Sequence, residues 1–290
     1  MVILMLEALK RLVEAGIPNI PSCYIMNSNT RREMPMIDNY LAGALIDIQV
    51  FIAINKLPVE VIQVEPSVSG RWTWTCLGRG KLPRFPGQSN DCSVDEKIIP
   101  MQRKVRDLER ETGNQIVSLV GSRYEESQAR KESMHKYQMS ELAIVDIDGR
   151  KTYSIIADWY LDDVWELITG CSGTETSPPK LFRTFRNDFD ELVGLYRDAN
   201  DGQCAVLIDG SSKKACGSRF GCAWCTVSGD RDKSLESMVK EDEEKYGFMN
   251  PLLKFREFLI SIRFDMSRRD FRGRNISPAK HMKVVPDYFL

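Results

Sequence analysis

The sequence predicts an α/β protein in which helices cover both faces of a parallel sheet. Helical segments alternate with short apolar strands along the first two thirds of the chain, and this alternation is typical of parallel strands joined by helical crossovers. The chain has 290 residues, 42% of them apolar, which is enough to bury a sizeable core. We expect a C-terminal region of helices and clustered cysteines to follow the sheet.

The first elements follow from apolar patterns bounded by proline or glycine. Several leucines between residues 3 and 15 share one helical face, and Gly16 ends that helix. The expected elements are a helix at 3–15, a strand at 22–26, a polar loop at 27–30, a helix from Pro35 to about 55, and a strand at 59–64. The polar loop lies at the carboxyl end of a strand, where ligands bind in α/β folds.

The middle of the chain begins with a long loop, residues 66–94, that interleaves arginine and lysine with tryptophan. This loop is either a platform for phosphates and bases or a solvated loop whose rings fold onto the core. The elements expected after it are a helix at 95–111 with Pro100 at a kink or at its true start, a buried strand at 115–120, a strand at 152–156, a helix at 159–168 capped by Asp158, and helices at 185–196, 233–246 and 251–262.

Composition restricts the class of protein. The formal net charge of −1 excludes a global basic signature for nucleic acid. The first residues do not form a secretory signal, and no strictly apolar run reaches 18 residues, so we expect a cytoplasmic protein that does not associate with a membrane. Two histidines and eight cysteines favour thiolate chemistry over a histidine base, and a reducing compartment disfavours disulfides.

Three cysteines, Cys216, Cys222 and Cys225, lie within ten residues, and Cys204 precedes them by twelve. Four thiolates converging on one small volume suit a metal ion or an iron–sulfur cluster. The alternatives are a disulfide with core cysteines and a structural zinc site. Zinc sites more often have two C-x2-C pairs, whereas this chain has one.

Four short motifs together resemble the PAPS-reductase-like branch of the ATP pyrophosphatases. Within that branch they look most similar to the Dnd-type DNA phosphorothioation sulfurtransferases, with the ATPase of the single-strand phosphorothioation system as a near alternative. The motifs are Asp91-Cys-Ser-Val-Asp-Glu-Lys97-Ile-Ile-Pro100, Gly121-Ser-Arg-Tyr-Glu-Glu-Ser127, Asp158-Trp-Tyr-Leu-Asp-Asp-Val-Trp165, and Cys216-Gly-Ser-Arg-Phe-Gly-Cys222-Ala-Trp-Cys225. The resemblance covers roughly residues 1–275, and the second and fourth motifs are specific in combination.

The resemblance implies an adenine-nucleotide α-hydrolase-like fold that splits Mg-ATP to AMP and pyrophosphate and so activates a DNA phosphate oxygen for replacement by sulfur. It also implies a cysteine desulfurase as sulfur donor, other phosphorothioation-system proteins as partners, and a [4Fe–4S] cluster. The cluster ligands would be Cys216, Cys222 and Cys225, with Cys204 as our choice for the fourth.

The same resemblance assigns roles to residues outside the cysteine motif. Cys92 competes with Cys204 as the fourth ligand or carries sulfur as a low-pKa thiol near cations. The residues expected to face ATP and its phosphates, or to orient the substrate, are Asn29, Thr30, Lys97, Gly121, Arg123, Glu126, Ser127 and Arg130. Arginine and lysine on loops at strand ends supply the positive charge that phosphoryl and adenylyl transfer need.

Two features depart from the family's pattern. The Ser-Gly-Gly-x-Asp-Ser loop that holds pyrophosphate is absent, and Asn29 replaces the usual aspartate of an Asp-Thr pair. The first residues resemble the helix that directly follows that loop. We therefore expect either a sequence that begins at an internal methionine or a degenerate subunit, and we favour the former because the sheet would otherwise lack a strand.

The expected organisation is an ATP-pyrophosphatase-like α/β domain at 1–200, apparently without its first strand and phosphate loop, followed by a cysteine-cluster region with helices and a basic tail at 201–290. The tail, from Arg263 to Lys283, is either a DNA contact or a solvated end. The alternative functions are a non-catalytic scaffold for a cysteine desulfurase and nucleic acid, a PAPS or APS reductase, and a tRNA thiolase. The reductase is disfavoured because its Glu-Cys-Gly-Leu-His tail is missing.

Overall fold

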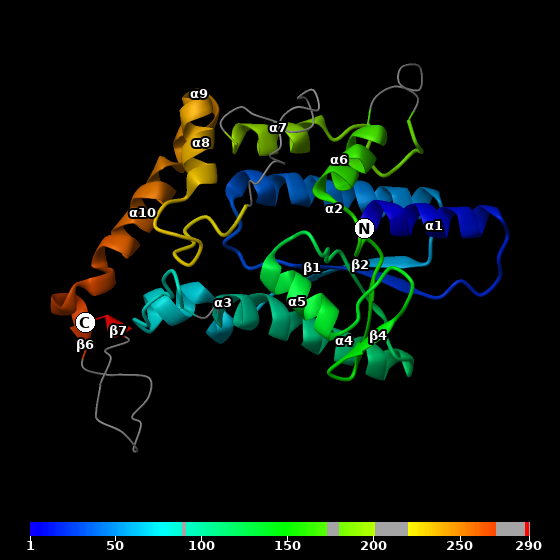
Figure 1. Ribbon diagram of the computed structural model, residues 1–290, viewed down its shortest axis with the longest axis horizontal. Coiled ribbons are helices and arrows are strands. Elements are labelled where there is room, and N and C mark those ends of the chain that lie inside the picture. Colours follow the sequence, from blue (N-terminus) through cyan, green and yellow to red (C-terminus); the bar gives the residue numbers. More distant parts are fainter. Residues whose placement is uncertain (89–90, 173–179, 201–219, 271–287, 290) are drawn as a thin grey trace.

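The computed structural model describes residues 1–88, 91–172, 180–200, 220–270 and 288–289. It is a mixed α/β structure with small parallel and mixed sheets, as Figure 1 shows. Strands β1 (Cys23–Ser28) and β2 (Val59–Val64) pair in parallel. Helix α2 (Pro35–Ile54) joins them, as a parallel pair requires a crossover connection.

A second sheet contains β3 (Ser118–Val120), β5 (Arg150–Ser154) and β4 (Val145–Ile147), in that spatial order. β3 is parallel to β5, and β4 is antiparallel to β5. Within the described residues this sheet is not hydrogen-bonded to β1–β2. The mixed α/β class is therefore confirmed, and the parallel pairs are consistent with parts of the expected sheet. A third pair joins β6 (Arg269–Asp270) to β7 (Tyr288–Phe289) in antiparallel register.

Helices lie on both faces of the β1–β2 pair. Helix α1 (Val2–Glu14) and helix α2 bury Leu6, Leu9 and Ile48 against Ile25 of β1 and Leu57, which precedes β2. Helix α4 (Ile99–Thr112) contacts both strands and lies below them in Figure 1, whereas α1 and α2 lie above. The carboxyl end of β1 is thereby held between two helical layers, and the loop after it leads into the candidate site.

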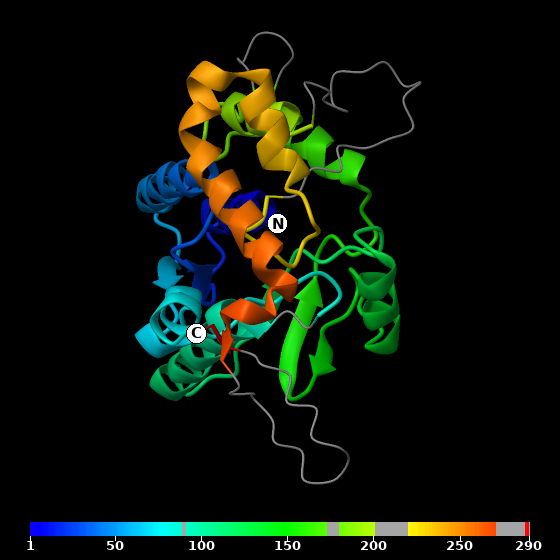
Figure 2. The same cartoon turned by 90° about the vertical axis from the view of Figure 1, so that its left-hand side faces the viewer.

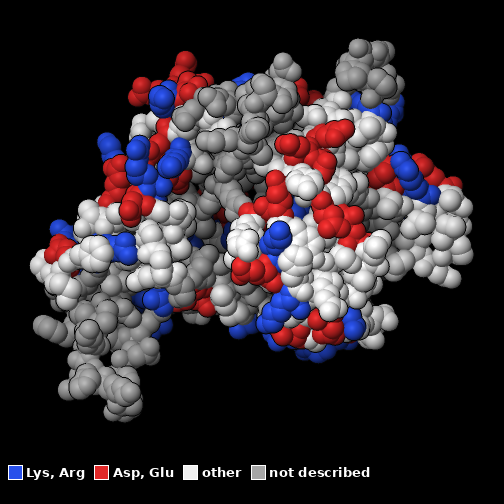
Figure 3. Space-filling view, in the orientation of Figure 1, with Lys and Arg blue, Asp and Glu red and all other residues white. Residues whose placement is uncertain are grey.

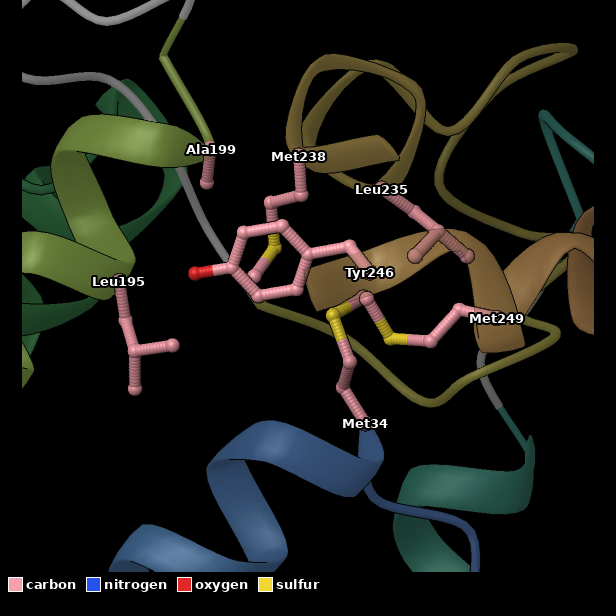
Figure 4. Close-up of a cluster of buried hydrophobic side chains, with 7 residues drawn as sticks. All are labelled: Met34, Leu195, Ala199, Leu235, Met238, Tyr246 and Met249. Carbon is pink, nitrogen blue, oxygen red and sulfur yellow. The ribbon is translucent and has the colours of Figure 1, made fainter. Parts of the chain in front are cut away.

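Helices α8 (Lys233–Glu241), α9 (Glu243–Tyr246) and α10 (Asn250–Ser261) form one end of the molecule (Figures 1 and 2). They pack on α7 (Asp190–Asp198) and on the start of α2 through a buried cluster rich in methionine. Figure 4 shows this cluster, which contains Met34, Leu195, Ala199, Leu235, Met238, Tyr246 and Met249. It fixes the helices that follow the cysteine motif against the helix that follows β1.

The other described elements are mostly short. They are the 3-10 helices η1 (Val68–Gly70), η5 (Gly247–Met249), η6 (Ile262–Phe264) and η7 (Met266–Arg268), the π-helical turns η2 (Thr73–Gly78) and η3 (Val94–Ile98), and the helices α3 (Asp91–Ser93), α5 (Gln128–Lys136) and α6 (Leu161–Gly170).

Several expected elements need correction. Residues 66–94 are partly helical, through η1, η2 and α3, and Trp72 is buried in the core, which favours the structural interpretation of that ring. The strand expected at 115–120 is shorter and only half-buried. The helix expected from Trp159 begins at Leu161 with Tyr160 as N-cap, so Asp158 is not its cap. Strand β4 and helix α5 were not expected at all.

Helix α2 is long and apolar enough, by length and composition, to cross a membrane, and it lies near the N-terminus. Helix α2 contains Asp38 and Asp47, so it is not a run of 18 consecutive apolar residues of the kind sought in the sequence. Asp47 pairs with Arg186 at 2.5 Å (Oδ2 to Nε), and the Arg186 guanidinium lies 4.4 Å from the Tyr40 ring centroid. One such helix also occurs in the cores of soluble proteins, so the expected location stays a prediction.

The methionine-rich cluster encloses a hydrogen bond that can be tested. Tyr246, fully buried, donates its hydroxyl to Asp198 Oδ2 at 2.6 Å. Burial of Asp198 opposes its charge, but Tyr246, Arg197 and Lys245 more than compensate, so the pKa of this carboxyl is lowered from 3.8. Its contribution to stability is therefore complete above pH 3.8 and is lost as the pH falls through the folded-state pKa.

We predict that Tyr246→Phe lowers the free energy of unfolding by about 1.5–3 kcal/mol at neutral pH, because a buried carboxylate loses a hydrogen bond. The deficit should shrink as the pH falls below 3.8, where Asp198 becomes protonated. Urea unfolding across this pH range measures both effects. Tyr24→Phe, in β1 and outside this cluster, is the matched control, and an equal loss in both variants would contradict the prediction.

Candidate functional site

The cysteine segment 222–225 lies against the loop that follows β1. The Ala223 amide donates to the Arg32 carbonyl at 2.8 Å, and Glu33 and Cys222 form an isolated antiparallel bridge. Within the segment, the Cys225 amide donates to the Cys222 carbonyl at 3.1 Å, which closes a tight turn. The late cysteine motif is thereby attached, backbone to backbone, to the carboxyl end of β1.

Arg256 of α10 holds the other side of the same segment. It is 1% exposed, and its Nε donates to the Cys225 carbonyl at 2.7 Å. Its two remaining nitrogens donate to the carbonyls of Asp230 and Gly229. A buried guanidinium needs such acceptors because its five donors cannot be left unsatisfied without a cost in free energy. Arg256 therefore fixes the path of the chain from the cysteine motif to α8.

Cys92 reaches the same place from a different part of the sequence. It packs with Trp224 and Phe255 against a buried cluster that contains Trp72 and Cys76. The rings of Trp72, Trp224 and Phe255 lie 5.9–6.5 Å apart in tilted or edge-on contact. Cys76, Cys92 and Cys225 also line one cavity, together with Arg32, Glu96 and Trp224.

A buried ion pair stands at the centre of this group. Arg32 is 4% exposed and Glu96 1% exposed, and the Arg32 Nη2 atom donates to Glu96 Oε2. Glu96 Oε1 accepts the Trp72 amide at 2.5 Å, and the Arg32 guanidinium lies 5.3 Å from the centroid of the Trp72 ring. The pair joins the loop after β1 to the turn before α4.

The Arg32 charge also acts on the thiols around it. Burial raises the pKa of the Cys222 thiol to about 11 and of the Cys76 thiol to about 12, and the positive charge of Arg32 offsets part of each shift. Burial likewise raises the pKa of Cys92, whereas the positive charge of Arg32 and its hydrogen bond to Cys92 lower it by a smaller amount. The low pKa expected for the Cys92 thiol is therefore wrong, because desolvation outweighs the nearby cation and the pKa is raised.

Residues expected to bind the nucleotide near β1 take part in contacts within the protein. Asn29 Oδ1 accepts the Arg31 amide at 2.8 Å. Thr30 is 1% exposed and donates its hydroxyl to Glu33 Oε1 at 2.8 Å, and Lys97 Nζ lies 3.6 Å from the same oxygen. The structure therefore brings Lys97 near the cysteine segment. The positive charge of Lys97 lowers the pKa of the Cys222 thiol and so offsets part of the rise that burial causes.

The residues expected to contact phosphate after β3 lie on the loop that leads into α5. Arg123 Nη1 is 3.3 Å from Glu125 Oε2, and Arg130 Nε is 3.1 Å from Glu126 Oε2. Ser127 is the N-cap of α5 and accepts the Arg130 amide at 3.2 Å. A Cβ atom at Gly121 would meet Ile156 and Met1 only at ordinary van der Waals distances, and the φ of Gly121 is not positive, so nothing here requires glycine. These contacts show a capped loop with ion pairs, and none of them joins the loop to the cysteine group.

Two of the expected cluster ligands, Cys204 and Cys216, lie outside the described residues. Among the residues that are described, no group of three or more His, Cys, Asp or Glu side chains is arranged to hold a metal ion, and no disulfide joins the described cysteines. In the basic tail, Arg268 pairs with Asp265 at 3.1 Å, and the residues 271–287 also lie outside the described part of the chain.

Sequence reasoning missed Arg32, Glu96 and Cys76. Arg32 and Glu96 are 64 residues apart, and no local pattern distinguishes a buried charged residue from the exposed ones that usually occupy loops. Cys76 could have been considered from its place in the long loop, which also leads to Cys92. Cys76 adds a third thiol to the cavity beside the buried Arg32 guanidinium, and Glu96 is the counter-charge of that guanidinium.

The fold and site together define a mixed α/β protein with a buried arginine–cysteine group at the carboxyl end of a parallel strand. Comparisons with protein-family models, with curated proteins and with solved structures gave no match.

We predict that Glu96→Gln lowers the free energy of unfolding by about 3–5 kcal/mol, because it leaves the Arg32 guanidinium buried without a counter-charge. Glu65→Gln is the control. It breaks more exposed pairs, with Arg31 and Arg71, and should cost about 0–1 kcal/mol. Urea unfolding measures both, and similar losses in the two variants would show that the Arg32–Glu96 pair is not a central support.

Proposed function

We propose that this chain is an ATP-dependent sulfurtransferase that replaces a DNA phosphate oxygen with sulfur and carries a [4Fe–4S] cluster. The observation that supports it best is the meeting of Cys92 with Cys222 and Cys225 around Arg32, because these cysteines come from the two motifs that resemble the phosphorothioation enzymes. The two motifs lie far apart in the sequence, at 91–100 and 216–225, so their proximity in space supports the proposal that they form one site.

The proposed cluster ligands are Cys92, Cys216, Cys222 and Cys225. The proximity of Cys92 to Cys225 favours Cys92 over Cys204 as the fourth ligand, which reverses the order of preference taken from sequence. Two buried donors beside these cysteines, Arg32 Nε and Trp224 Nε1, have no hydrogen-bond partner, and the described cysteines are partly shielded from solvent. The described residues do not by themselves form a metal-binding group, and Cys216 lies outside them. A metal would hold these cysteines as thiolates in spite of their raised pKa values.

For the fold, we propose that β1–β2 and β3–β5 belong to an adenine-nucleotide α-hydrolase-like sheet. Both pairs are parallel, and the loops 29–33 and 121–127 each follow the carboxyl end of a strand. Such loops are where α/β proteins bind nucleotides. Within this proposal, Lys97 and Arg123 supply positive charge to phosphates once substrate displaces their present acidic partners.

The proposed reaction has two transfers. A DNA phosphate oxygen attacks the α-phosphorus of Mg-ATP, and pyrophosphate leaves. The terminal sulfur of a persulfide then attacks the DNA phosphorus, and AMP leaves with the original oxygen. A second thiolate breaks the remaining S–S bond, so that the DNA keeps one sulfur and the two thiols end as a disulfide. The persulfide comes from a cysteine desulfurase, and the other proteins of a phosphorothioation system and DNA complete the set of cytoplasmic partners.

On the face shown in Figure 3, Lys and Arg of the described residues are interspersed with Asp and Glu. A channel for nucleic acid needs a local excess of positive charge.

A second candidate function is a non-catalytic scaffold that binds a cysteine desulfurase and nucleic acid. It is favoured by the contacts of the nucleotide-site residues, since Asn29 and Thr30 stabilise their own loop and Arg123 and Arg130 pair with acids. This candidate keeps the cysteine group and gives up the ATP chemistry.

We predict that anaerobic purification yields a brown protein that absorbs at about 400 nm and holds about four irons per chain. Cys92→Ser and Cys225→Ser should each lose most of the iron, because each removes a ligand. Cys204→Ser and Cys23→Ser should keep it, and Cys23 is a matched control at the opposite end of β1. A colourless protein with one tightly bound zinc would contradict the cluster.

We further predict that the chain releases pyrophosphate from ATP when DNA and a persulfide donor are present. Lys97→Met should lower this rate by about 100-fold, since it removes a positive charge from the developing transition state. Lys104→Met, on α4, is the control for charge loss and should keep the wild-type rate. Intact iron binding without any pyrophosphate release from the wild-type chain would favour the scaffold.

A further inference from the structure

The end of helix α10 and the turns after it expose large apolar side chains. Phe264 of η6 is 79% exposed, and Met266 of η7 and Phe258 of α10 are also exposed. A single exposed apolar residue is ordinary on a protein surface, but a group of them on consecutive elements is typical of an interaction site. We call this group, together with Arg263 and Arg268, the ring–arginine surface.

Arg263 fixes the most exposed of these rings. Its Cζ atom lies 4.8 Å from the centroid of the Phe264 ring and 5.4 Å from the centroid of the buried Phe85 ring. Its Nη2 atom donates to the Pro86 carbonyl at 3.1 Å. Both ring distances are within the range of a cation–π interaction. Phe264 is therefore held against an anchored cation while most of its ring remains in solvent.

Arg268 makes a similar contact with the second ring. Its Cζ atom lies 5.7 Å from the centroid of the Phe258 ring, and its Nε atom is 3.1 Å from Asp265 Oδ2. More than half of the Arg268 side chain is nevertheless exposed. The surface thus presents two rings, each with a guanidinium group against it.

The turn η2 extends the same end of the molecule. Cys76 of η2 shares a buried cluster with Leu259 of α10 and Ile262 of η6, so these elements pack together. On η2, Trp74 and Leu77 are exposed. The long loop of residues 66–94 therefore places one ring, Trp72, in the core and another on the surface beside the end of α10.

Positive charge is in excess along these two segments. Residues 71–88 contain four Lys or Arg and no acidic residue, and residues 254–268 contain four Lys or Arg and two acidic residues. Three of these cations are engaged by Glu65, by Asp91 or by buried carbonyls. The others are Arg79, Lys81, Lys254, Arg263 and Arg268. This is the local excess of cations that a polyanion requires.

We propose that the ring–arginine surface binds a single-stranded stretch of nucleic acid, with bases stacked on Phe264 and Phe258 and phosphates held by the arginines. Aromatic rings that stack on any base and cations that follow the backbone are the two components of single-strand binding sites. In a duplex the base faces are already stacked, so the rings would have no partner. The inference rests on the proposed function for its DNA and names the form in which that DNA is bound.

An apolar occupant fits this surface less well. A membrane interior or an apolar protein face that covered Phe264 and Phe258 would also have to desolvate the guanidinium groups against them, and burying an unpaired charge is costly. A nucleic-acid strand instead supplies phosphates to the same two arginines.

The experiment measures fluorescence anisotropy of labelled oligo(dT), and of a duplex of equal length, with the purified full chain. We expect tighter binding of oligo(dT) than of the duplex, and a loss of about 10-fold in affinity for oligo(dT) in Phe264→Ala, because one stacking ring is removed. Phe248→Ala is the matched control, since Phe248 is an exposed ring on η5, before α10, and it should bind as the wild type does.

The second variant tests the phosphate contact. Arg268→Gln should flatten the dependence of log affinity on log salt concentration by about 0.7, the value for one phosphate of a single strand. Arg110→Gln is its control, because Arg110 is also exposed and also pairs with an aspartate three residues before it. Wild-type affinity in Phe264→Ala overturns the inference, and so does an unchanged salt slope in Arg268→Gln. Equal or tighter binding of the duplex also overturns it.

The binding assay needs neither ATP nor a cluster, so this inference and the proposed function can fail separately. Pyrophosphate release with duplex DNA, without binding of oligo(dT), contradicts the inference alone. Binding of oligo(dT) that depends on Phe264, without pyrophosphate release, contradicts the proposed enzyme alone. Binding of oligo(rU) but not of oligo(dT) supports the surface and contradicts DNA as its ligand. Binding of anionic phospholipid vesicles but of neither strand overturns the inference in favour of a membrane.

Discussion

The site depends on one buried ion pair, Arg32 with Glu96. Separating two charges from water is costly, and the pair is tolerated because each partner has further contacts: the Trp72 ring beside Arg32 and the Trp72 amide on Glu96. The pair ties the loop after β1 to the turn before α4. Cys92 precedes Glu96 by four residues, and Cys222 bridges to the residue after Arg32. The position of both cysteines therefore follows from the position of the pair.

Arg256 completes the site from the opposite side. It satisfies three backbone carbonyls between Cys225 and Asp230, while the methionine-rich cluster anchors α8 and α9 to the start of α2. The cysteine segment is consequently held by a strand-end loop on one side and by the helical end of the molecule on the other. This arrangement explains why the thiols are shielded from solvent and why burial dominates their pKa values.

Sequence patterns predicted the elements that carry strong local signals. Helix α1, β1, α2 and β2 lie where leucine periodicity, Pro35 and short apolar runs placed them. Strand β4 has three residues and α5 lacks an apolar face, so neither has such a signal. The resemblance singled out Cys92, Cys222 and Cys225, and the sequence reasoning chose Cys204 over Cys92 as the fourth ligand. That choice, like the burial of Arg32 and Glu96, depends on contacts between distant residues that no local pattern encodes.

The central claim is that these cysteines hold one iron–sulfur group rather than separate thiols or zinc. X-ray absorption at the iron edge, on the anaerobically purified full chain, tests it most directly because it reports the ligand atoms and the neighbouring metals together. The account predicts a first shell made of sulfur and a second shell that contains iron. Zinc in place of iron, or a first shell of nitrogen and oxygen, would contradict it.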